Sequence, residues 1–258
     1  MLISVIITNF NKDKYLYKSL KSIDDQKYKN LEIILFDDCS TDKSLEIINR
    51  FKKVQLIKNK NKRFKSGPLN QINGILKAFN LSKGKVICLL DSDDIFFSNK
   101  LDEISKFFKD NTDKHFVVNL PNNQNIFKLK RKVSNNKIWP SIFPTSCISF
   151  RRTFFDNFKS YIKAKQYENL EIDARLIMYS YFNREFNILN KRLTRYIKDK
   201  KGISSNYKKY SLNWWFKRRE AFEYLRFILK KRKLSFVKSF DYLFTNLVYF
   251  FLNLFKKL

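Results

Sequence analysis

Glycine and proline are scarce in this chain of 258 residues, which contains only four of each. A Gly-rich phosphate loop and a disordered, low-complexity chain are therefore both disfavoured. Cys39, Cys88 and Cys147 are scattered singly, so they provide neither a metal-ligand spacing nor a disulfide framework. This cysteine usage fits a reduced cytosolic compartment. The sequence begins with an apolar stretch and no basic leader, so we expect no secretory signal.

Acidic residues are also in the minority, because 53 Lys and Arg stand against 24 Asp and Glu, which gives a formal net charge of +29 at pH 7. Such a surface attracts polyanions, so nucleic acid, an anionic membrane and phosphorylated substrates are candidate partners. Aromatic residues make up 17% of the chain and include 27 Phe, which argues against disorder. At this length we expect one large domain, or a domain and a half.

The most informative stretch, residues 85–94, is an apolar run that ends in three carboxylates, Asp91, Asp93 and Asp94. Residues 86–90 are too few for a helix and indicate a buried strand. Ligands of open α/β sheets bind outside the carboxyl ends of the strands, where these carboxylates would lie. A hard cation such as Mg²⁺ or Mn²⁺ would relieve their mutual repulsion. The alternative is an acidic turn that caps the following helix.

The rest of the first hundred or so residues alternates strand-like and helix-like patterns. The order β-α-β-α-β-α-β predicts an α/β fold with a mostly parallel sheet, flanked by helices and joined by right-handed crossovers. The predicted strands are residues 2–8, 31–36, 54–57 and 86–90, and the predicted helices are residues 15–23, 44–51, 69–81 and 99–108.

Polar clusters follow three of these strands, at residues 8–11, 37–42 and 91–94. The carboxyl ends of parallel strands meet at one edge of a sheet, so three such clusters favour a binding site over isolated turns. The alternative for the carboxylates of the second cluster is helix capping, a role for which Asp42 is best placed.

The side chains of these clusters suit a nucleotide. Phe10 can stack on a base, unless it is a core aromatic, and Asp38 can accept a hydrogen bond from a base N–H group. Asp91 can accept one from a ribose hydroxyl, and Asp93 can hold a divalent ion against a diphosphate.

Together, the motifs at residues 4–11, 37–42 and 90–94 resemble the nucleotide-binding half of the family 2 inverting glycosyltransferases, which have a GT-A fold. The resemblance covers about the first hundred residues. One departure is Thr8, where many members have Pro. Another is the stretch 66–74, which only loosely follows the family's Arg-Asn-x-Gly pattern.

The resemblance implies a nucleotide-sugar donor and Mg²⁺ or Mn²⁺ as cofactor. By this resemblance, Asp93 binds the metal ion that bridges the donor diphosphate. The resemblance assigns Thr8, Phe10 and Asp38 to the base and Asp91 to the ribose or the metal. Asn11 and Asn73 complete the residues that it places at the nucleotide sugar.

The family places its general base in a Glu-Asp-x-x-Leu motif that opens a helix. Here Asp173 and Leu176 match the Asp and the Leu, while Ile172 stands at the Glu position. The resemblance therefore implies that Asp173 is the catalytic base, with Glu171 as a displaced alternative. The structural alternative for Asp173 is a carboxylate favoured by the dipole at a helix N-terminus.

Two further features lie in the second half of the chain. Residues 195–205 are similar to the loop where many members carry a His near the diphosphate, and because no His is present, Lys200 or Lys201 is a candidate for that positive role. Trp139 is a candidate contact for the acceptor sugar, although a buried core Trp is the more common arrangement.

The C-terminal part of the sequence has its own character. Residues 213–233 pair aromatic residues with a dense cationic face, and residues 234–255 are almost wholly apolar. The apolar run 242–255 is shorter than the roughly 20 residues needed to cross a bilayer. Trp214, Trp215 and the basic block suit the headgroup zone, so we predict an interfacial helix on an anionic membrane surface. The alternatives are helices that close the domain's own core, or a dimer contact.

We therefore expect a GT-A glycosyltransferase domain over residues 1–210 and a helical, membrane-associating extension over residues 211–258. Residues 1–110 would bind the nucleotide sugar, and residues 111–210 would bind the acceptor. The predicted activity is metal-dependent, inverting transfer of a sugar to a saccharide or lipid-linked acceptor in cell-envelope glycan synthesis, of the lipopolysaccharide or capsule type. The protein would be peripheral on the cytoplasmic face of the inner membrane.

Two other classes of function remain open. A catalytically inactive, membrane-bound glycan-binding module would tolerate loss of Asp93 or Asp173, and both are present. A nucleic-acid-binding protein would explain the net charge and would bind with a steep salt dependence. Its phosphates would be repelled by the acidic strand ends, so we expect no nucleic-acid partner.

Overall fold

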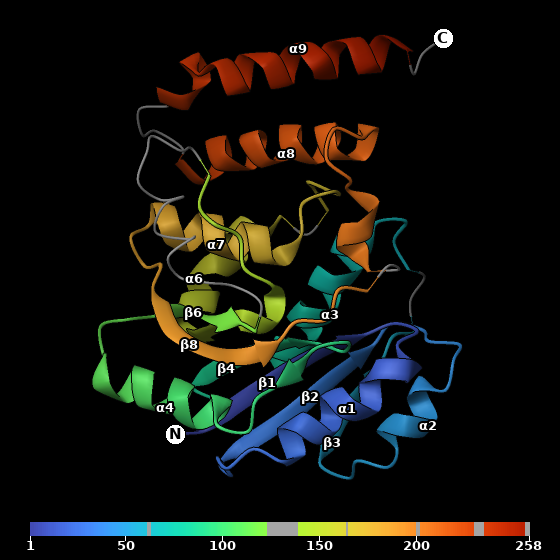
Figure 1. Ribbon diagram of the computed structural model, residues 1–258, viewed down its shortest axis with the longest axis vertical. Coiled ribbons are helices and arrows are strands. Elements are labelled where there is room, and N and C mark those ends of the chain that lie inside the picture. Colours follow the sequence, from blue (N-terminus) through green and yellow to red (C-terminus); the bar gives the residue numbers. More distant parts are fainter. Residues whose placement is uncertain (61–62, 123–138, 164, 200–201, 230–234, 256–258) are drawn as a thin grey trace.

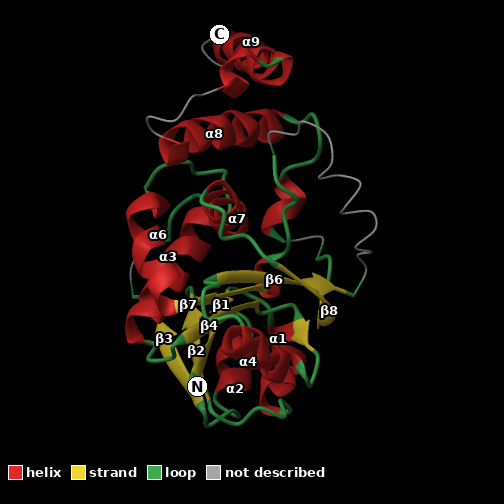
Figure 2. Cartoon of the chain, turned by 90° about the vertical axis from the view of Figure 1, so that its left-hand side faces the viewer, coloured by secondary structure: helices red, strands yellow, loops and turns green. Residues whose placement is uncertain are grey.

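A computed structural model describes residues 1–60, 63–122, 139–163, 165–199, 202–229 and 235–255 (Figure 1). Helices lie on both faces of a central sheet, and the C-terminal helices are stacked beyond one of these faces (Figure 2). The α/β class predicted from the sequence is confirmed.

The first half of the chain builds a parallel sheet. Its strands are β1 (Ile3–Asn9), β2 (Leu31–Asp37), β3 (Val54–Lys58) and β4 (Val86–Asp91). Strand β1 lies between β2 and β4 and is parallel to both, and β3 is parallel to β2. The connecting helices are α1 (Asp13–Asp24), α2 (Ser44–Ile48) and α3 (Gly67–Leu81). The predicted alternation of strands and helices is thus confirmed.

The second half of the chain adds a mixed part to the same sheet. Its strands are β5 (Ile95–Phe96), β6 (Phe116–Pro121), β7 (Ile148–Arg151) and β8 (Ile188–Arg195). Strand β7 is antiparallel to β4 and β6, β8 is parallel to β6, and β5 is antiparallel to β8. In the described residues, the strand order is β3-β2-β1-β4-β7-β6-β8-β5. The short 3-10 helix η1 (Thr145–Cys147) leads into β7.

Alternating side chains of the parallel strands enter two separate cores, because neighbouring residues of a strand point to opposite faces. Val5 and Ile7 pack with α1, α2 and the helix α4 (Lys100–Asp110), which follows the acidic turn. Ile6 packs in the other core, with α3 and the helices α6 (Arg152–Ile162) and α7 (Ile172–Phe182). Figure 2 shows these two helical layers on either side of the sheet.

Helix α3 lies unusually close to the sheet. A Cβ atom at Gly74 would come within 2.6 Å of the Phe36 ring and within 3.0 Å of the Thr8 methyl group, so only glycine fits there. The helix begins after Ser66, whose side chain accepts a hydrogen bond from the Leu69 N–H group, as helix N-caps do. This close packing brings the first turns of α3 to the carboxyl ends of β1 and β4.

Arg175 organises the turn between α6 and α7. Its side chain is fully buried, and its guanidinium donates hydrogen bonds only to backbone carbonyl groups. An unpaired buried cation would be strongly unfavourable, so these acceptors fix the path of the turn that leads to α7. The acceptors are the carbonyl oxygens of Ile162, Lys163, Gln166, Tyr167 and Leu170.

The two C-terminal helices are packed differently from each other. Helix α8 (Leu212–Leu229) lies on α7 and buries Phe222, Tyr224 and Leu225 in the same core as α6 and α7. Helix α9 (Phe240–Phe255) follows the 3-10 helix η3 (Ser235–Lys238) and lies on α8 as the outermost layer (Figure 1). In the part of the chain that the structure describes, no helix has both the length and the apolar character needed to cross a bilayer.

Candidate functional site

A cavity of about 230 Å³ lies at the carboxyl ends of β1, β2 and β4. The first turns of α3 and α7 and the residues that follow β8, including the 3-10 helix η2 (Ile203–Asn206), complete its walls. Most of the predicted site residues line this cavity, namely Thr8, Phe10, Asp38, Asp91, Asp93 and Asp173. Residues that were predicted separately to bind the donor and to act on the acceptor therefore share one cavity.

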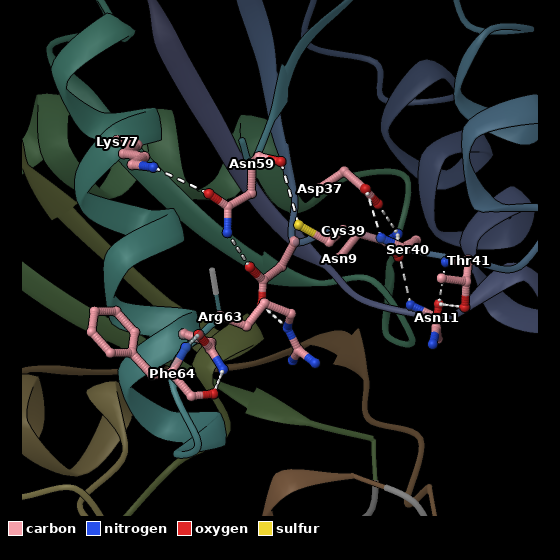
Figure 3. Close-up of polar contacts among 12 residues, drawn as sticks. Asn9, Asn11, Asp37, Cys39, Ser40, Thr41, Asn59, Arg63, Phe64 and Lys77 are labelled. Carbon is pink, nitrogen blue, oxygen red and sulfur yellow. Dashed lines mark hydrogen bonds and ion pairs between the residues drawn. The ribbon is translucent and has the colours of Figure 1, made fainter. Parts of the chain in front are cut away.

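Asn11 and Asn73 are not among the lining residues. The side chain of Asn11 accepts a hydrogen bond from the Thr41 N–H group at 2.8 Å, while its own backbone N–H donates to Ser40 (Figure 3). Asn11 has a φ of 50°, a left-handed conformation that Asn tolerates. It therefore ties two loops together at the rim of the site.

On α3, the residues that line the cavity are Gly67, Asn70 and Gln71. Asn73 lies about one helical turn further along, on the same helix but outside the cavity lining. Asn70 also fixes the neighbouring loop, because it accepts from the Phe64 N–H group at 2.8 Å and donates to the Phe64 carbonyl oxygen at 2.9 Å. The sequence comparison named Asn73 alone in this stretch, and no sequence pattern pointed to Asn70.

The acidic cluster after β2 divides into two kinds of carboxylate. Asp37 is buried and accepts hydrogen bonds from the Asn9 side chain at 2.8 Å and from the Ser40 N–H group at 3.0 Å (Figure 3). Asp42 accepts from the backbone N–H groups of Asp13 and Ser44. Both carboxylates therefore hold the loops in place. Asp42 lies just before Lys43, the N-cap of α2, and accepts from the first residue of this helix without being its cap.

Asp38 belongs to the cavity itself. It forms an ion pair with Arg63, whose Nε lies 2.6 Å from the carboxylate, and accepts a hydrogen bond from Asn59 at 2.7 Å. The guanidinium of Arg63 also lies over the Phe10 ring, 3.3 Å from its centroid. A planar cation thus covers the aromatic face on which a base was predicted to stack.

Asp91 and Asp94 are placed deeper in the acidic turn. Asp91 accepts a hydrogen bond from Gln71 at 2.8 Å, and burial together with the neighbouring carboxylates Asp94, Asp93 and Asp173 raises its pKa well above the usual value. Burial is also the main cause that raises the pKa of Asp94 to about 6. Asp94 accepts from the Ile197 N–H group at 2.8 Å, which holds the chain segment after β8 against the cavity.

Asp93 forms an ion pair with a lysine of the same chain. The ammonium of Lys12 lies 2.6 Å from Asp93 and 2.5 Å from Asp199, which follows β8. Burial lowers the pKa of Lys12, but its hydrogen bonds to the two carboxylates outweigh burial and raise this pKa above the usual value. Lys200 and Lys201, which the sequence suggested for a positive role, lie outside the described residues.

The donor set at Asp93 suits a hard cation. Asp93 and Asp199 direct carboxylate oxygens at one point, which the ammonium now satisfies. Mg²⁺ is usually bound by one or two carboxylates together with water and substrate phosphates, so a third protein ligand is not required. Among the residues that the structure describes, there is no group of three or more His, Cys, Asp or Glu side chains that could hold a metal ion.

The wall of the cavity that was predicted to face the acceptor, called the acceptor-side wall below, begins at the N-terminus of α7. Asp173 lies in its first turn and accepts a hydrogen bond from the Ala174 N–H group at 2.6 Å. Burial, reinforced by the nearby Glu171, raises the pKa of Asp173 to about 7. Glu171 also lines the cavity, and its carboxylate pairs with Lys217 of α8 at 2.5 Å. No sequence pattern linked Lys217 to this wall.

Trp139 lies away from the cavity lining. Its ring packs edge-on against Phe222 of α8 with a centroid distance of 4.5 Å, and its Nε1–H donates to Asp241 of α9 at 3.2 Å. Trp139 thus joins the two C-terminal helices to the body of the protein, as the core alternative predicted.

The sheet is parallel in its first half and carries a carboxylate-rich cavity at its strand ends. The model of Glycosyl transferase family 2 matches residues 4–203, so the chain belongs to this family. The family that the sequence motifs resemble is thus confirmed.

Among curated proteins, the chain is 40% identical over 121 residues to an uncharacterized glycosyltransferase from Haemophilus influenzae, and the match covers 45% of each chain. It is 40% identical over 100 residues to an Escherichia coli protein named UDP-Glc:alpha-D-GlcNAc-diphosphoundecaprenol beta-1,3-glucosyltransferase WfaP, over 39% of this chain and 38% of that one. These matches therefore span less than half of each relative.

Two solved structures show the same fold over most of the chain. The structure of S. aureus TarS 1-349 in complex with UDP matches with a TM-score of 0.62 and 19% sequence identity. The match covers 93% of the present chain and 75% of the TarS chain. The mannosyltransferase PcManGT from Pyrobaculum calidifontis, in complex with GDP-Man and Mn²⁺, has a TM-score of 0.65 and 16% identity, over 90% and 65% of the two chains. The GT-A fold predicted from the sequence is confirmed.

Proposed function

We propose that this protein is a metal-dependent, inverting glycosyltransferase that moves a sugar from a nucleoside diphosphate to a saccharide or lipid-linked acceptor in cell-envelope glycan synthesis. One observation carries the proposal. Asp91 and Asp93, suited to a metal-bound diphosphate, share a single cavity with Asp173, which is suited to act as a base.

The donor would enter at the ends of β1 and β2. Phe10 offers a stacking surface for the base, and Asp38 offers an acceptor for a base N–H group. The Arg63 guanidinium contacts both Phe10 and Asp38 in this structure. The base therefore has to displace the guanidinium or bind beside it. The bound nucleotides named for TarS and PcManGT, UDP and GDP-Man, support a donor of this class.

Asp93 and Asp199 would hold the divalent ion, with Lys12 moving aside toward the diphosphate. When bound, such an ion stabilises the negative charge that develops on the leaving nucleoside diphosphate. The two carboxylates supply the hard oxygen ligands that Mg²⁺ and Mn²⁺ prefer, and the Mn²⁺ named for PcManGT supports a divalent ion in this fold.

Asp173 would take the proton from the acceptor hydroxyl. A pKa of about 7 suits a base that works near neutral pH, because enough of the carboxylate is ionised while it still attracts a proton. The ion pair with Lys217 keeps Glu171 occupied, which favours Asp173 over Glu171 for this role. The hydroxyl oxygen would then attack the anomeric carbon from the side opposite the leaving group.

The envelope role is supported by α9. Its exposed side carries a continuous stripe of large apolar side chains at helical spacing, while its other side packs on α8. Such a face, on a chain with a net charge of +29, suits insertion into the headgroup region of an anionic membrane from the cytoplasmic side. The stripe consists of Phe240, Leu243, Phe244, Leu247, Phe250, Phe251 and Leu254.

The proposed activity is tested by incubating the protein with UDP-glucose, UDP-GlcNAc and GDP-mannose, each with and without Mn²⁺ or Mg²⁺. We expect metal-dependent release of the nucleoside diphosphate and metal-dependent thermal stabilisation by one of these donors. Asp93→Ala should abolish the metal dependence of both. If no common nucleotide sugar is bound or cleaved with either metal, the proposed donor site is wrong.

Membrane association is tested separately with vesicles of anionic and of neutral phospholipid. Replacing Leu247 and Phe250 by Asp should lower partition to anionic vesicles by about a hundredfold, because each large apolar side chain contributes roughly 1.5–3 kcal/mol on burial. Lys53→Gln, which removes an exposed charge far along the sequence from α9, is the control. Unchanged vesicle binding, or a concentration-dependent dimer that the double variant disrupts, would overturn the membrane assignment.

A further inference from the structure

Helix α8 contacts the segment in front of α7 at two points about one turn apart. Lys217 pairs with the Glu171 carboxylate at 2.5 Å, and Glu220 accepts hydrogen bonds from the backbone and side-chain N–H groups of Asn169, both at 2.7 Å. Residues three apart lie on the same face of a helix. One face of α8 therefore holds residues 169–171, directly before the first turn that carries Asp173.

The contact between α8 and residues 169–171 is largely shielded from water, and further side chains support it. The Lys217 ammonium also lies 4.7 Å from the centre of the Tyr207 ring, and the Tyr207 hydroxyl is 3.4 Å from the Asn169 side chain. The side chain of Glu171 is only 10% exposed, so the attraction between it and Lys217 is weakly screened by water. Lys217 itself does not line the cavity, so it supports the wall from behind.

The charge of Lys217 matters because two carboxylates lie side by side. Glu171 and Asp173 both line the cavity and repel each other when both are ionised. Lys217 offsets the charge of Glu171 and also lowers the pKa of Asp173, against the larger effect of burial. The titratable and charged groups around this pair are Asp91 of β4, Arg175 of α7, Tyr207 and, on α8, Lys217 and Glu220.

We propose that Lys217 and Glu220 of α8 are positioning residues of the active site. Glu220 fixes the backbone at Asn169, and Lys217 holds the Glu171 carboxylate toward α8, so that Asp173 alone meets the acceptor hydroxyl. This inference rests on the proposed function for its catalytic part. Its structural part, the hold of Lys217 on Glu171, is independent of the reaction.

The first experiment therefore measures stability and not activity. Melting temperatures of the wild type, Lys217→Met and Lys217→Arg are compared at pH 5 and pH 8. Removing the cation leaves a sheltered carboxylate without its charge partner, so Lys217→Met should lower the melting temperature by several degrees. This decrease should be smaller at pH 5 than at pH 8, because lower pH favours the neutral form of a sheltered carboxylate that has lost its cation. Lys217→Arg should behave like the wild type.

The matched control is Arg226→Met, which removes a cation from an exposed position of α8 away from residues 169–173. Its melting temperature should change equally at both pH values. An equal, small loss for Lys217→Met at pH 5 and pH 8 would overturn the proposed hold on Glu171, whatever the activity of the protein. In the double variant Glu171→Gln with Lys217→Met, the decrease in melting temperature should no longer differ between pH 5 and pH 8.

The second experiment measures the pH profile of kcat/KM for hydrolysis of the nucleotide sugar found in the donor screen, in which water takes the place of the acceptor. In Lys217→Met, the acidic limb of this pH profile should shift to higher pH by about one unit. The reason is that loss of a nearby cation favours the protonated form of the Asp173 carboxylate. Lys217→Arg should restore the limb, and Glu171→Gln with Lys217→Met should return it toward the wild-type position.

Glu220→Ala should lower kcat about tenfold while the affinity for the donor stays unchanged, since misplacement of a reacting group slows the reaction without affecting donor contacts. A wild-type rate in Glu220→Ala would remove Glu220 from the proposal, and an unmoved acidic limb in Lys217→Met would remove Lys217 from it. A wild type that hydrolyses no donor would overturn the proposed function instead, while the melting data still decide the contact between Lys217 and Glu171.

Discussion

The donor-side and acceptor-side walls of the cavity neutralise their carboxylates in different ways. On the donor side, Asp38 pairs with Arg63 and Asp93 pairs with Lys12, and both cations line the cavity. On the acceptor side, the partner of Glu171 comes from α8 and lies behind the wall. The donor-side cations therefore stand where ligand groups are proposed to bind, whereas the acceptor-side cation does not.

This difference separates two tasks. Ion pairs that line a cavity can be exchanged when a ligand brings its own charges, so the donor side can remain neutralised both before and after binding. A pair behind the wall stays in place and preserves the position of the groups in front of it. The predictions below address each side in turn, from the largest expected effect to the smallest.

The largest effect is expected on the acceptor side, from Asp173→Asn. Asn keeps the size and most of the hydrogen bonding but cannot accept a proton at neutral pH, so single-turnover transfer at saturating donor should fall by about 10²–10⁴-fold. Donor affinity, measured by calorimetry, should hardly change. Asn is also a good residue at a helix N-terminus, so near-normal transfer would show that Asp173 only stabilises α7. If Glu171→Gln is the inactive variant instead, the base lies two residues earlier.

The same wall predicts a pH dependence. Asp173 must be deprotonated to act as a base, and its pKa is raised to about 7, so the rate should fall as the pH drops below this value. Below pH 7 we expect about a tenfold loss of kcat/KM for each pH unit. Circular dichroism over the same pH range separates this loss from unfolding. A rate that stays constant down to pH 5 would contradict the assignment.

On the donor side, Lys12→Met tests whether the ammonium competes with a metal ion. With this cation removed, Asp93 and Asp199 both lose their ion pair with Lys12, so the affinity for Mn²⁺ alone should rise about tenfold. The measurement is a titration of free Mn²⁺ by electron paramagnetic resonance, without nucleotide. Lys14→Met, two residues further on, serves as the control. Equal or weaker Mn²⁺ binding in Lys12→Met would show that the ion pair and the metal do not share a site.

The smallest effect is expected from Arg63→Met, which frees Asp38 and the face of Phe10. Because the side chain of Arg63 is 31% exposed, its ion pair is worth less than about 1 kcal/mol, so UDP should bind about threefold more tightly. Calorimetry with UDP and Mn²⁺ measures the change. Weaker binding would show that Arg63 contacts the nucleotide itself and is not displaced by it.

The parallel sheet and the position of the cavity could be predicted from the sequence because both follow from local patterns. Apolar runs define the strands, and the topology brings Thr8, Asp38 and Asp91 to one edge of the sheet. The roles assigned to these residues stay predictions, as does the division of the chain at residue 210.

The remaining site residues depend on contacts that no local pattern encodes. Lys12 and Asp199 are 187 residues apart in the sequence, and Glu171 and Lys217 are 46 apart. The choice between Asn70 and Asn73 depends on the rotation of α3, which the close approach at Gly74 sets. Helices α8 and α9 are both rich in aromatic residues, and only tertiary packing decides that one is buried and the other keeps an exposed stripe.

The guanidinium of Arg175 gives the turn before α7 an unusual property. Its carbonyl acceptors surround one cation much as the oxygen ligands of a calcium loop surround their ion, except that this cation is covalently attached to the helix that follows. No chelator, change of salt or ordinary change of pH can remove it, because an arginine stays charged. The turn should therefore resist opening in hydrogen exchange.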